Sequence, residues 1–343
     1  MAEPPAKCVE RADKAVELLT YRPPPLLRRY VQCLWTVRCL RDDMVMLKMF
    51  ANVASGLIIK HQHGRSALPA STGLQCFNYD ELPKAFVYGK RTQPGQVCAQ
   101  GPFELTGAVF KPQGLQALLR IDAADVNDGP VNVDDVIGTG VADRLFNAAS
   151  ASEGCSVLGR TLSALVANAR ADDGLVADGL RFLHDCARNA RIPQLLQALS
   201  ISERQFERRF VRAVGVSPHH YLRIARFQKA ARLLRIGRFD KLSDVAAELN
   251  YADQSHFIKD TREFSAYTPT ALWETVRAAV ELPCALILAP APTAHEVAPV
   301  ACDPVLSTGP DPPAASEAAI LLLRASSRPS EAASSADPTG AAD

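Results

Sequence analysis

The sequence lacks the segments that would place it in or across a membrane. No run of 18 or more apolar residues occurs, whereas a transmembrane helix needs about 20. The opening residues, MAEPPAKCVERADKAVELL, also lack the apolar stretch of a signal peptide. We therefore expect a cytoplasmic protein with no membrane partner.

Paired metal ligands and the glycine-rich motifs of many enzymes are missing as well. Nine cysteines are present, but no two form a CxxC pair, and their odd number and wide spacing favour reduced thiols over disulfides or a zinc site. There is no GxSxG, P-loop or GxGxxG motif. We expect no catalytic residue, no cofactor and no metal.

Two histidines leave one alternative open. His61 and His63, in IIKHQHG, would lie on the same face of a strand, a spacing with which cupins begin a metal site. The rest of a cupin frame is absent around them. The rival interpretation is thus a cupin-like metal-binding or enzymatic domain with a helical appendage, and the simpler one is a pair of solvated histidines at a strand end.

The sequence does contain enough apolar residues, 48% of 343, to bury the cores of two domains. From Tyr21 to about residue 135, short apolar runs alternate with proline and glycine, a pattern typical of an antiparallel sandwich or barrel. Trp35 and Tyr30 would pack in its core or line a ligand pocket. The clearest runs are 31–37, 53–59, 85–89 and 103–110.

The pattern changes twice further along the chain. From 141 to 199 the apolar spacing lengthens to three or four residues, which indicates helices. After Pro283 the composition turns to alanine, proline and serine, which cannot bury enough apolar surface to offset the entropy of ordering. We expect a disordered tail, in which AAILLLR (318–324) forms a short helix or stays inert.

Charge is spread unevenly. Between Arg181 and Arg277 there are 17 lysines and arginines against 10 aspartates and glutamates, a surplus of 7 in a chain whose net charge is +1. Such a local basic surplus is typical of a nucleic-acid-binding module within a neutral protein.

Two similar segments lie about 50 residues apart within this basic region. IPQLLQALSISERQFERRF (192–210) and LSDVAAELNYADQSHFIKDTREF (242–264) each contain an apolar-spaced helix, a tight turn at Ser200 or Asn250, and a second helix capped by Ser202 or Asp253. Asn250 tolerates a left-handed backbone better than Ser200 does. The pattern predicts two helix-turn-helix units.

The second helix of each unit leaves a polar face. Arginine reads guanine, glutamine reads adenine and glutamate accepts from cytosine in the major groove, so two such helices could read grooves about 34 Å apart. The helix between the units has a basic stripe that would hold phosphates or only keep the surface soluble. The polar faces comprise Arg204, Glu207, Arg208 and Arg212, then Gln254, Ser255, His256 and Lys259, and the stripe comprises Arg223, Arg226, Lys229 and Arg232.

The segments RQFERRFVRAVGVSPHHYLRIARFQKAARLL and VAAELNYADQSHFIKDTREFSAYTPTAL resemble the DNA-binding domain of AraC/XylS-type transcription regulators. The resemblance implies seven helices, with Glu203–Val214 and Gln254–Glu263 as recognition helices. Thr261 and Ala266 depart from the family, which usually has an aromatic residue and a glycine there. The implied base contacts are Arg204, Glu207, Arg208, Gln254, Ser255 and Lys259, and we assign phosphate contacts to Arg212, Arg223, Arg226 and Arg262.

The front half, through YRPPPLLRRYVQCLWTV and FELTGAVFKPQGLQALL, is similar to an N-terminal domain often attached to such modules. We expect an α+β protein of four segments: a flexible N-terminus (1–20), a mostly antiparallel β domain that ends in helices and senses or dimerises (21–172), an all-α double helix-turn-helix domain (175–280) and a disordered tail (283–343). Candidate partners are double-stranded DNA, RNA polymerase, a small-molecule effector and a second copy of the chain.

The expected function is sequence-specific transcription regulation, with the two units reading adjacent major-groove segments of a promoter and the N-terminal domain modulating them. Besides the cupin-like rival, an architectural DNA binder that reads no particular sequence stays open.

Overall fold

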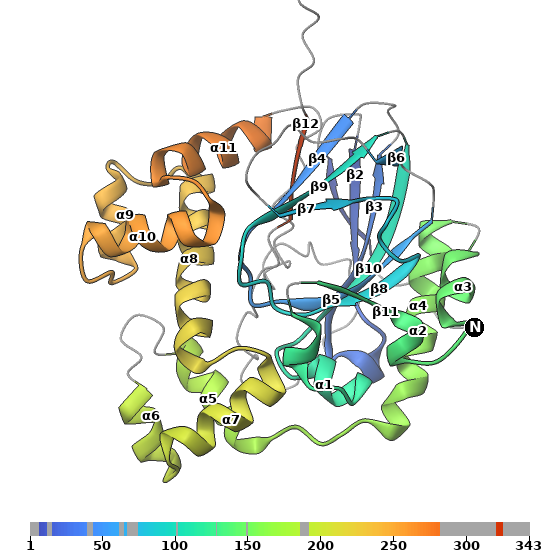
Figure 1. Cartoon of the computed structure of the whole chain (residues 1–343), viewed down its shortest axis with the longest axis horizontal. Helices are drawn as coiled ribbons and strands as arrows, with labels where there is room; N and C mark the ends of the chain where they lie inside the picture. Colours follow the sequence, from blue (N-terminus) through green and yellow to red (C-terminus); the bar gives the residue numbers. More distant parts are fainter. Residues whose placement is uncertain are drawn as a thin grey trace, which may run out of the picture.

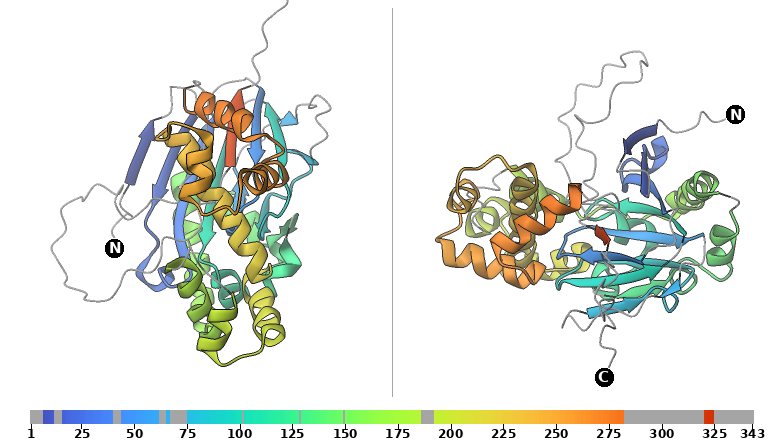
Figure 2. Two further views of the ribbon diagram at one scale, coloured as in Figure 1. Left: turned by 90° about the vertical axis from the view of Figure 1, so that its left-hand side faces the viewer. Right: turned by 90° about the horizontal axis from the view of Figure 1, so that it is seen from above.

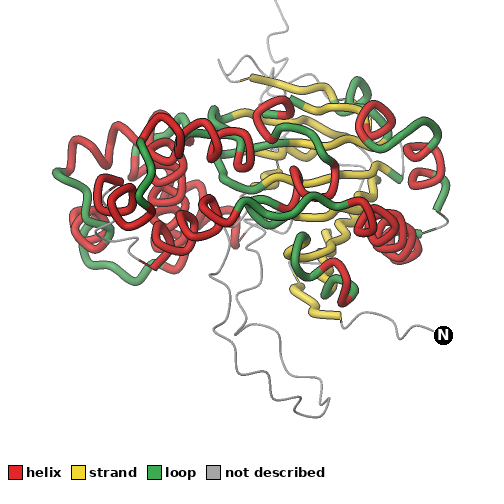
Figure 3. The backbone as a smooth tube through the Cα atoms, turned by 90° about the horizontal axis from the view of Figure 1, so that it is seen from below, coloured by secondary structure: helices red, strands yellow, loops and turns green. Residues whose placement is uncertain are grey.

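The computed structural model has a β-rich N-terminal part and a helical C-terminal part, which lie side by side (Figure 1). Seen from below, most helices gather beside the strands, and a smaller group lies at the opposite end (Figure 3). This is the α+β arrangement that the sequence predicted. The residues described are 7–11, 16–39, 44–61, 65–66, 75–100, 102–127, 129–148, 150–185, 192–281 and 320–324.

The N-terminal part contains two sheets. One has seven strands in the order β1-β2-β3-β10-β5-β8-β11, and the other has the order β12-β4-β9-β6, with β7 also paired to β9. All of these pairs are antiparallel except β7 with β9. The strands are β1 (Lys7–Arg11), β2 (Val16–Tyr21), β3 (Val31–Cys39), β4 (Met44–Met49), β5 (Ser55–Lys60), β6 (Arg65–Ser66), β7 (Gln75–Asn78), β8 (Ala85–Tyr88), β9 (Gly95–Gln100), β10 (Phe103–Phe110), β11 (Pro130–Asn132) and β12 (Ile320–Arg324).

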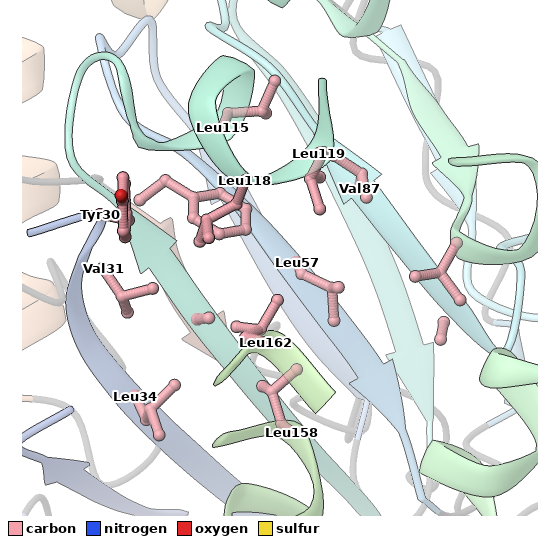
Figure 4. Close-up of a cluster of buried hydrophobic side chains, with 14 of the residues drawn as sticks. Tyr30, Val31, Leu34, Leu57, Val87, Leu115, Leu118, Leu119, Leu158 and Leu162 are labelled. Carbon is pink, nitrogen blue, oxygen red and sulfur yellow. The ribbon is translucent and has the colours of Figure 1, made fainter. Parts of the chain in front are cut away.

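Strand β10 runs through the middle of the larger sheet, and all eight of its residues are buried. A strand covered on both faces is mostly apolar or small, and its two polar residues have partners: Glu104 pairs with Arg38, and the Thr106 hydroxyl lies 2.8 Å from His61 Nε2. Helix α4 (Ala151–Leu165) covers one face, where Leu158 and Leu162 pack with Leu34 and Leu57 (Figure 4). The short apolar runs of the sequence are thus confirmed as sheet strands.

Short helices connect and cover the larger sheet. Apolar residues three or four apart in α4 point at the sheet, while the residues between them face solvent. The helical segments of this part are η1 (Pro25–Leu27), α1 (Gly114–Leu119), η2 (Ala123–Val126), α2 (Val133–Val136), α3 (Val141–Phe146), α4 (Ala151–Leu165) and η3 (Val166–Asn168).

Between residues 174 and 281 the structure describes seven helices, the number that the resemblance implied. None of the described helices combines the length and the apolar character that a membrane crossing requires. These helices are α5 (Gly174–Asp185), α6 (Ile192–Leu199), α7 (Glu203–Val214), α8 (Pro218–Ile236), α9 (Leu242–Glu248), α10 (Gln254–Ser265) and α11 (Pro269–Glu281).

The seven helices form two small cores with α8 between them (Figure 2). The first unit is centred on Phe206 and Phe210, which pack with residues of α5 and α6. The second is centred on Phe227, Phe257 and Phe264, which pack with residues of α9 and α11. Helix α8 contributes to both cores, with Tyr221 and Leu222 packed against the first and Phe227 within the second.

One segment of the tail differs from expectation. Ile320–Arg324, predicted to form a short helix or to stay inert, is strand β12, paired antiparallel with β4. A row of branched apolar side chains suits a strand when a neighbour offers unpaired backbone groups, and the edge of β4 supplies them. The other tail residues lie outside the described part of the chain.

Candidate nucleic-acid interface

Both helix-turn-helix units turn through a residue with a left-handed backbone. Ser200 has φ of 50° and Asn250 has φ of 51°. The N–H of Ile201 donates to the carbonyl of Leu196 at 3.2 Å, and the N–H of Tyr251 donates to the carbonyl of Ala246 at 3.0 Å. This bond closes the end of the first helix. The predicted turns are confirmed.

The helix that follows each turn begins at its predicted cap. The Ser202 hydroxyl accepts from the N–H of Gln205 at 3.4 Å, and the Asp253 carboxylate accepts from the N–H of His256 at 2.8 Å. The latter bond holds the pKa of Asp253 below its usual value. In each candidate recognition helix, the cap side chain therefore satisfies one of the free backbone donors of the first turn.

The predicted base-contacting residues all lie on exposed positions. On α7, Phe206 and Phe210 point into the core, and Arg208 lies on the opposite side of the helix. Among the described residues, none forms an ion pair or a hydrogen bond with the side chains of these six residues. Their polar groups are therefore available to a ligand. The six are Arg204, Glu207, Arg208, Gln254, Ser255 and Lys259.

The four predicted phosphate contacts have different surroundings. Arg262 is exposed in the last turn of α10. The Arg226 guanidinium lies over the Tyr251 ring, 5.2 Å from its centroid. Arg212 and Arg223 donate to carboxylates of the protein itself, and their phosphate contacts stay a prediction.

Arg223 on α8 donates hydrogen bonds to two carboxylates of α10. Its Nε and Nη2 donate to Asp260 Oδ1 at 3.2 and 2.7 Å, and its Nη1 and Nη2 donate to Glu263 at 3.1 and 2.6 Å. The bonds to Glu263 first, and then those to Asp260, raise the pKa of Arg223. Asp260 is buried, so its charge requires a partner. The guanidinium is consequently occupied rather than free for a phosphate.

A signal for this pairing was present in the sequence. Asp260 lies between Phe257 and Phe264 on the apolar side of α10, where an unpaired carboxylate would be costly. Its partner was not identifiable, because Arg223 is 37 residues away on another helix.

The loop between β4 and β5 enters the core of the second unit. Phe50 makes edge contacts with Phe227 and Tyr267, each with ring centroids 6.3 Å apart. The N–H of Ala51 donates to the carbonyl of Phe264 at 2.9 Å. This part of the N-terminal domain is thus continuous with the hydrophobic core of the second helical unit.

The first unit is held by the segment around η2. Asn127 donates to the carbonyl of Gly215 at 2.7 Å, and the Arg212 Nε lies 3.0 Å from Asp122 Oδ1. Gly215 has φ of 103°, and a Cβ there would lie 3.0 Å from the Ala123 carbonyl oxygen, so the approach requires glycine. These contacts join residues far apart in sequence, which is why sequence patterns missed them.

The linker before α5 is also fixed. Gln113 accepts from the N–H of Asp173 at 3.0 Å, and the Asp173 carboxylate accepts from Arg209 at 2.7 Å. The same carboxylate accepts from the N–H groups of Leu175 and Val176 at the start of α5. One linker residue therefore joins the N-terminal domain to α5 and α7.

Only one residue of the histidine pair, His61, lies in the described part of the chain. The His61 Nε2 is 2.8 Å from the Thr106 hydroxyl, burial lowers the pKa of its imidazole, and His63 lies outside the described residues. Within the described ranges, no three His, Cys, Asp or Glu side chains come close enough to bind a metal. Cys33 and Cys155 are free thiols whose pKa burial raises to about 12.

Residues 195–274 match a family described as a helix-turn-helix domain, and residues 19–132 match a domain of unknown function, DUF6597. None of the curated proteins matches the sequence. The predicted resemblance of the C-terminal domain is confirmed by the first match.

Several solved structures share parts of the arrangement. The C-terminal domain of AraT, a response regulator from Geobacillus stearothermophilus, is 19% identical over 30% of this chain and 86% of its own, with a TM-score of 0.29. ToxT from Vibrio cholerae O395 is 12% identical over 69% of this chain and 95% of its own, with a TM-score of 0.37, and its P21 form is 12% identical over 76% and 98%, with a TM-score of 0.40.

Proposed function

Because the C-terminal part is a helix-turn-helix domain of the AraC type, we propose that this protein is a sequence-specific transcription regulator in which α7 and α10 read adjacent major-groove segments of a promoter. The same proposal includes RNA polymerase and a second copy of the chain as partners.

The observation that carries this proposal is the shared construction of the two units. Each has a left-handed turn, a capped second helix, and on that helix three exposed polar side chains without described partners. Arg208 can donate two hydrogen bonds to guanine, and Gln254 can pair with adenine. A DNA binder without sequence preference needs only cationic side chains that contact phosphates. These faces also carry the amide of Gln254 and the carboxylate of Glu207, which can contact base edges.

Footprinting of the full chain on genomic fragments, with excess competitor DNA, tests the proposal. Two protected major-groove segments about one helical turn apart are expected at discrete sites. Uniform protection that competitor DNA removes would favour the architectural alternative.

We further propose that the N-terminal domain modulates DNA binding through its contacts with both units. The loop at Phe50 enters the core of the second unit, and Asp122 pairs with Arg212, one turn along α7 from Arg208. A phosphate that approached Arg212 would compete with the Asp122 carboxylate. A change in the N-terminal domain that moved either contact would therefore alter how α7 and α10 meet DNA.

A small apolar molecule is the effector that the N-terminal domain would best accommodate. The sheet face away from α4 carries Trp35, Ile58 and Phe86, which keep 7–9% of their surface exposed, while Leu57 on the helix-covered face keeps 0%. The hydroxyl of Tyr88, on that same face, is buried without a hydrogen-bond partner among the described residues. An apolar ligand with one hydrogen-bonding group would satisfy both features.

The fluorescent probe 1-anilinonaphthalene-8-sulfonate tests this site. Saturable binding is expected, with weaker binding to Ile58→Trp, which fills the face, and unchanged binding to the exposed control Leu26→Trp. Equal binding to all three proteins would argue against a site on this face.

A further inference from the structure

We infer that Arg223 is a positioning residue that sets the distance and rotation between α7 and α10, and thereby the spacing of the two DNA segments that the protein reads. This inference rests on the proposed function. It assigns Arg223 a role in selecting the site, in place of the phosphate contact predicted from sequence.

The geometry of the Arg223 contacts is directional. Four hydrogen bonds run from one planar guanidinium on α8 to two carboxylates one turn apart on α10. If α10 rotated about its axis, Asp260 and Glu263 would move in the same sense and both pairs of bonds would break. Apolar contacts such as Phe227 with Phe264, whose ring centroids are 5.6 Å apart, tolerate such a rotation better because they have no fixed direction.

The guanidinium is also held from its flat side. It lies over the Phe264 ring at 5.0 Å, so the core of the second unit fixes its plane. Asp260 is 6% exposed, and its burial strengthens the bonds that it accepts. Arg223 is therefore fixed on three sides by α10.

The contact of α8 with the first unit lies next to Arg223 in the chain. Tyr221, two residues earlier on α8, meets Phe210 of α7 edge-on, with ring centroids 5.6 Å apart. Tyr221 and Arg223 thus connect α7 and α10 within one turn of the shared helix. Adding one base pair between the half-sites moves the second by about 3.4 Å and about 35°, a change that a fixed pair of helices does not follow.

The test measures binding of the full chain to DNA whose two half-sites are separated by the natural spacing or by one base pair more or fewer. We expect the wild type to lose about tenfold or more in affinity when the spacing changes. The double variant Arg223→Met/Asp260→Leu removes the hydrogen bonds between Arg223 and α10 and leaves no buried charge. Replacing a buried ion pair by apolar residues in this way often preserves stability. The double variant should bind the natural spacing within about threefold of wild type and lose less than about threefold at the others.

Two further variants keep the test decisive. Glu263→Gln leaves the buried Asp260 pair intact and should relax the spacing preference partly, so it decides the question if the double variant does not fold. Arg262→Ala, in the same helix, should weaken binding equally at every spacing and lower the slope of log affinity against log salt by about 1.

An unchanged spacing preference in a folded Arg223→Met/Asp260→Leu protein would overturn the inference. A uniform loss with a lower salt slope would do so as well, because it would make Arg223 a phosphate contact. If the wild type protects no discrete site, the proposed function fails, and that result is recognisable before any variant is made.

Discussion

Lys90 is an ionisable residue enclosed within the N-terminal domain. It is 1% exposed, and its Nζ donates to the buried Ser55 hydroxyl at 3.2 Å. Burial lowers the pKa of Lys90 to about 7. The folded protein therefore releases this proton at a lower pH than the unfolded chain, whose lysines titrate near 10.4.

Between these two pKa values the unfolded state holds more protons, so stability should rise as the pH increases from about 7 towards 10. Urea unfolding of the wild type at several pH values should show this rise, and Lys90→Met should flatten it. Lys84→Met, at an exposed lysine that pairs with Asp143, is the matched control. If Lys90→Met followed the wild-type curve, the buried lysine would not be the cause.

Arg208 is the residue whose substitution should change the DNA sequence preference of the protein most clearly. It is exposed on the side of α7 opposite Phe206 and Phe210. Arg208→Ala should weaken specific binding by about 1–3 kcal/mol and relax the preference at one base pair. Binding titrations against a set of single-base variants of the site would measure both effects.

The control for Arg208 is Arg181→Ala on α5, since that arginine pairs with Asp178 outside both recognition helices. It should leave binding unchanged. A loss of equal size on every DNA sequence would contradict base reading by Arg208 and indicate a phosphate contact.

At the scale of elements, the end of α10 carries backbone strain. Ala266, where the family usually has glycine, has φ of 64°. A left-handed backbone costs an alanine about 1 kcal/mol, and glycine adopts it freely. Ala266→Gly should therefore raise the free energy of unfolding by about 1 kcal/mol, as measured by urea denaturation.

Ala247→Gly is the matched change within a helix. Ala247 is exposed in α9, so glycine there should lower the free energy of unfolding by about 0.5–1 kcal/mol. If both substitutions destabilised the protein, strain at Ala266 would not be significant.

Element boundaries were predictable where the signals are local. Ser202 and Asp253 mark the starts of α7 and α10, and Pro218 marks the start of α8, because capping and proline geometry depend only on neighbouring residues. Thr261, which stands where the family usually has an aromatic residue, is buried, and its hydroxyl donates to the Phe257 carbonyl at 2.7 Å. Strand β12 was not predictable, because a strand forms only where another strand offers its edge.

At the scale of the whole molecule, the ion pair between Asp122 and Arg212 connects the N-terminal domain to α7, the first of the two proposed recognition helices. Both side chains are largely exposed, so the pair itself contributes little to stability. Asp122→Asn would free Arg212 and remove a negative charge near the DNA. Affinity for DNA should rise by about two- to fivefold at low salt.

Asp125→Asn is the control for this change, because Asp125 is an exposed residue of η2 whose removal alters net charge equally. It should raise affinity less than Asp122→Asn does. In an Arg212→Ala background the effect of Asp122→Asn should shrink to that of the control. A persistent full gain would mean that the ion pair does not restrain α7.

By itself, the sequence determined the elements and their surfaces. Periodicity, caps and turn residues depend on neighbours within a few positions, so they predicted the strands of the sheet, the two helix-turn-helix units and the exposed polar faces of α7 and α10. Only the tertiary structure decided which side chains far apart in the sequence meet. Arg223 with Asp260, Arg212 with Asp122, and Phe50 with Phe227 are 37, 90 and 177 residues apart in the sequence. Such pairs form because packing brings distant helices and loops together, and no local pattern encodes which of several arginines will find a carboxylate.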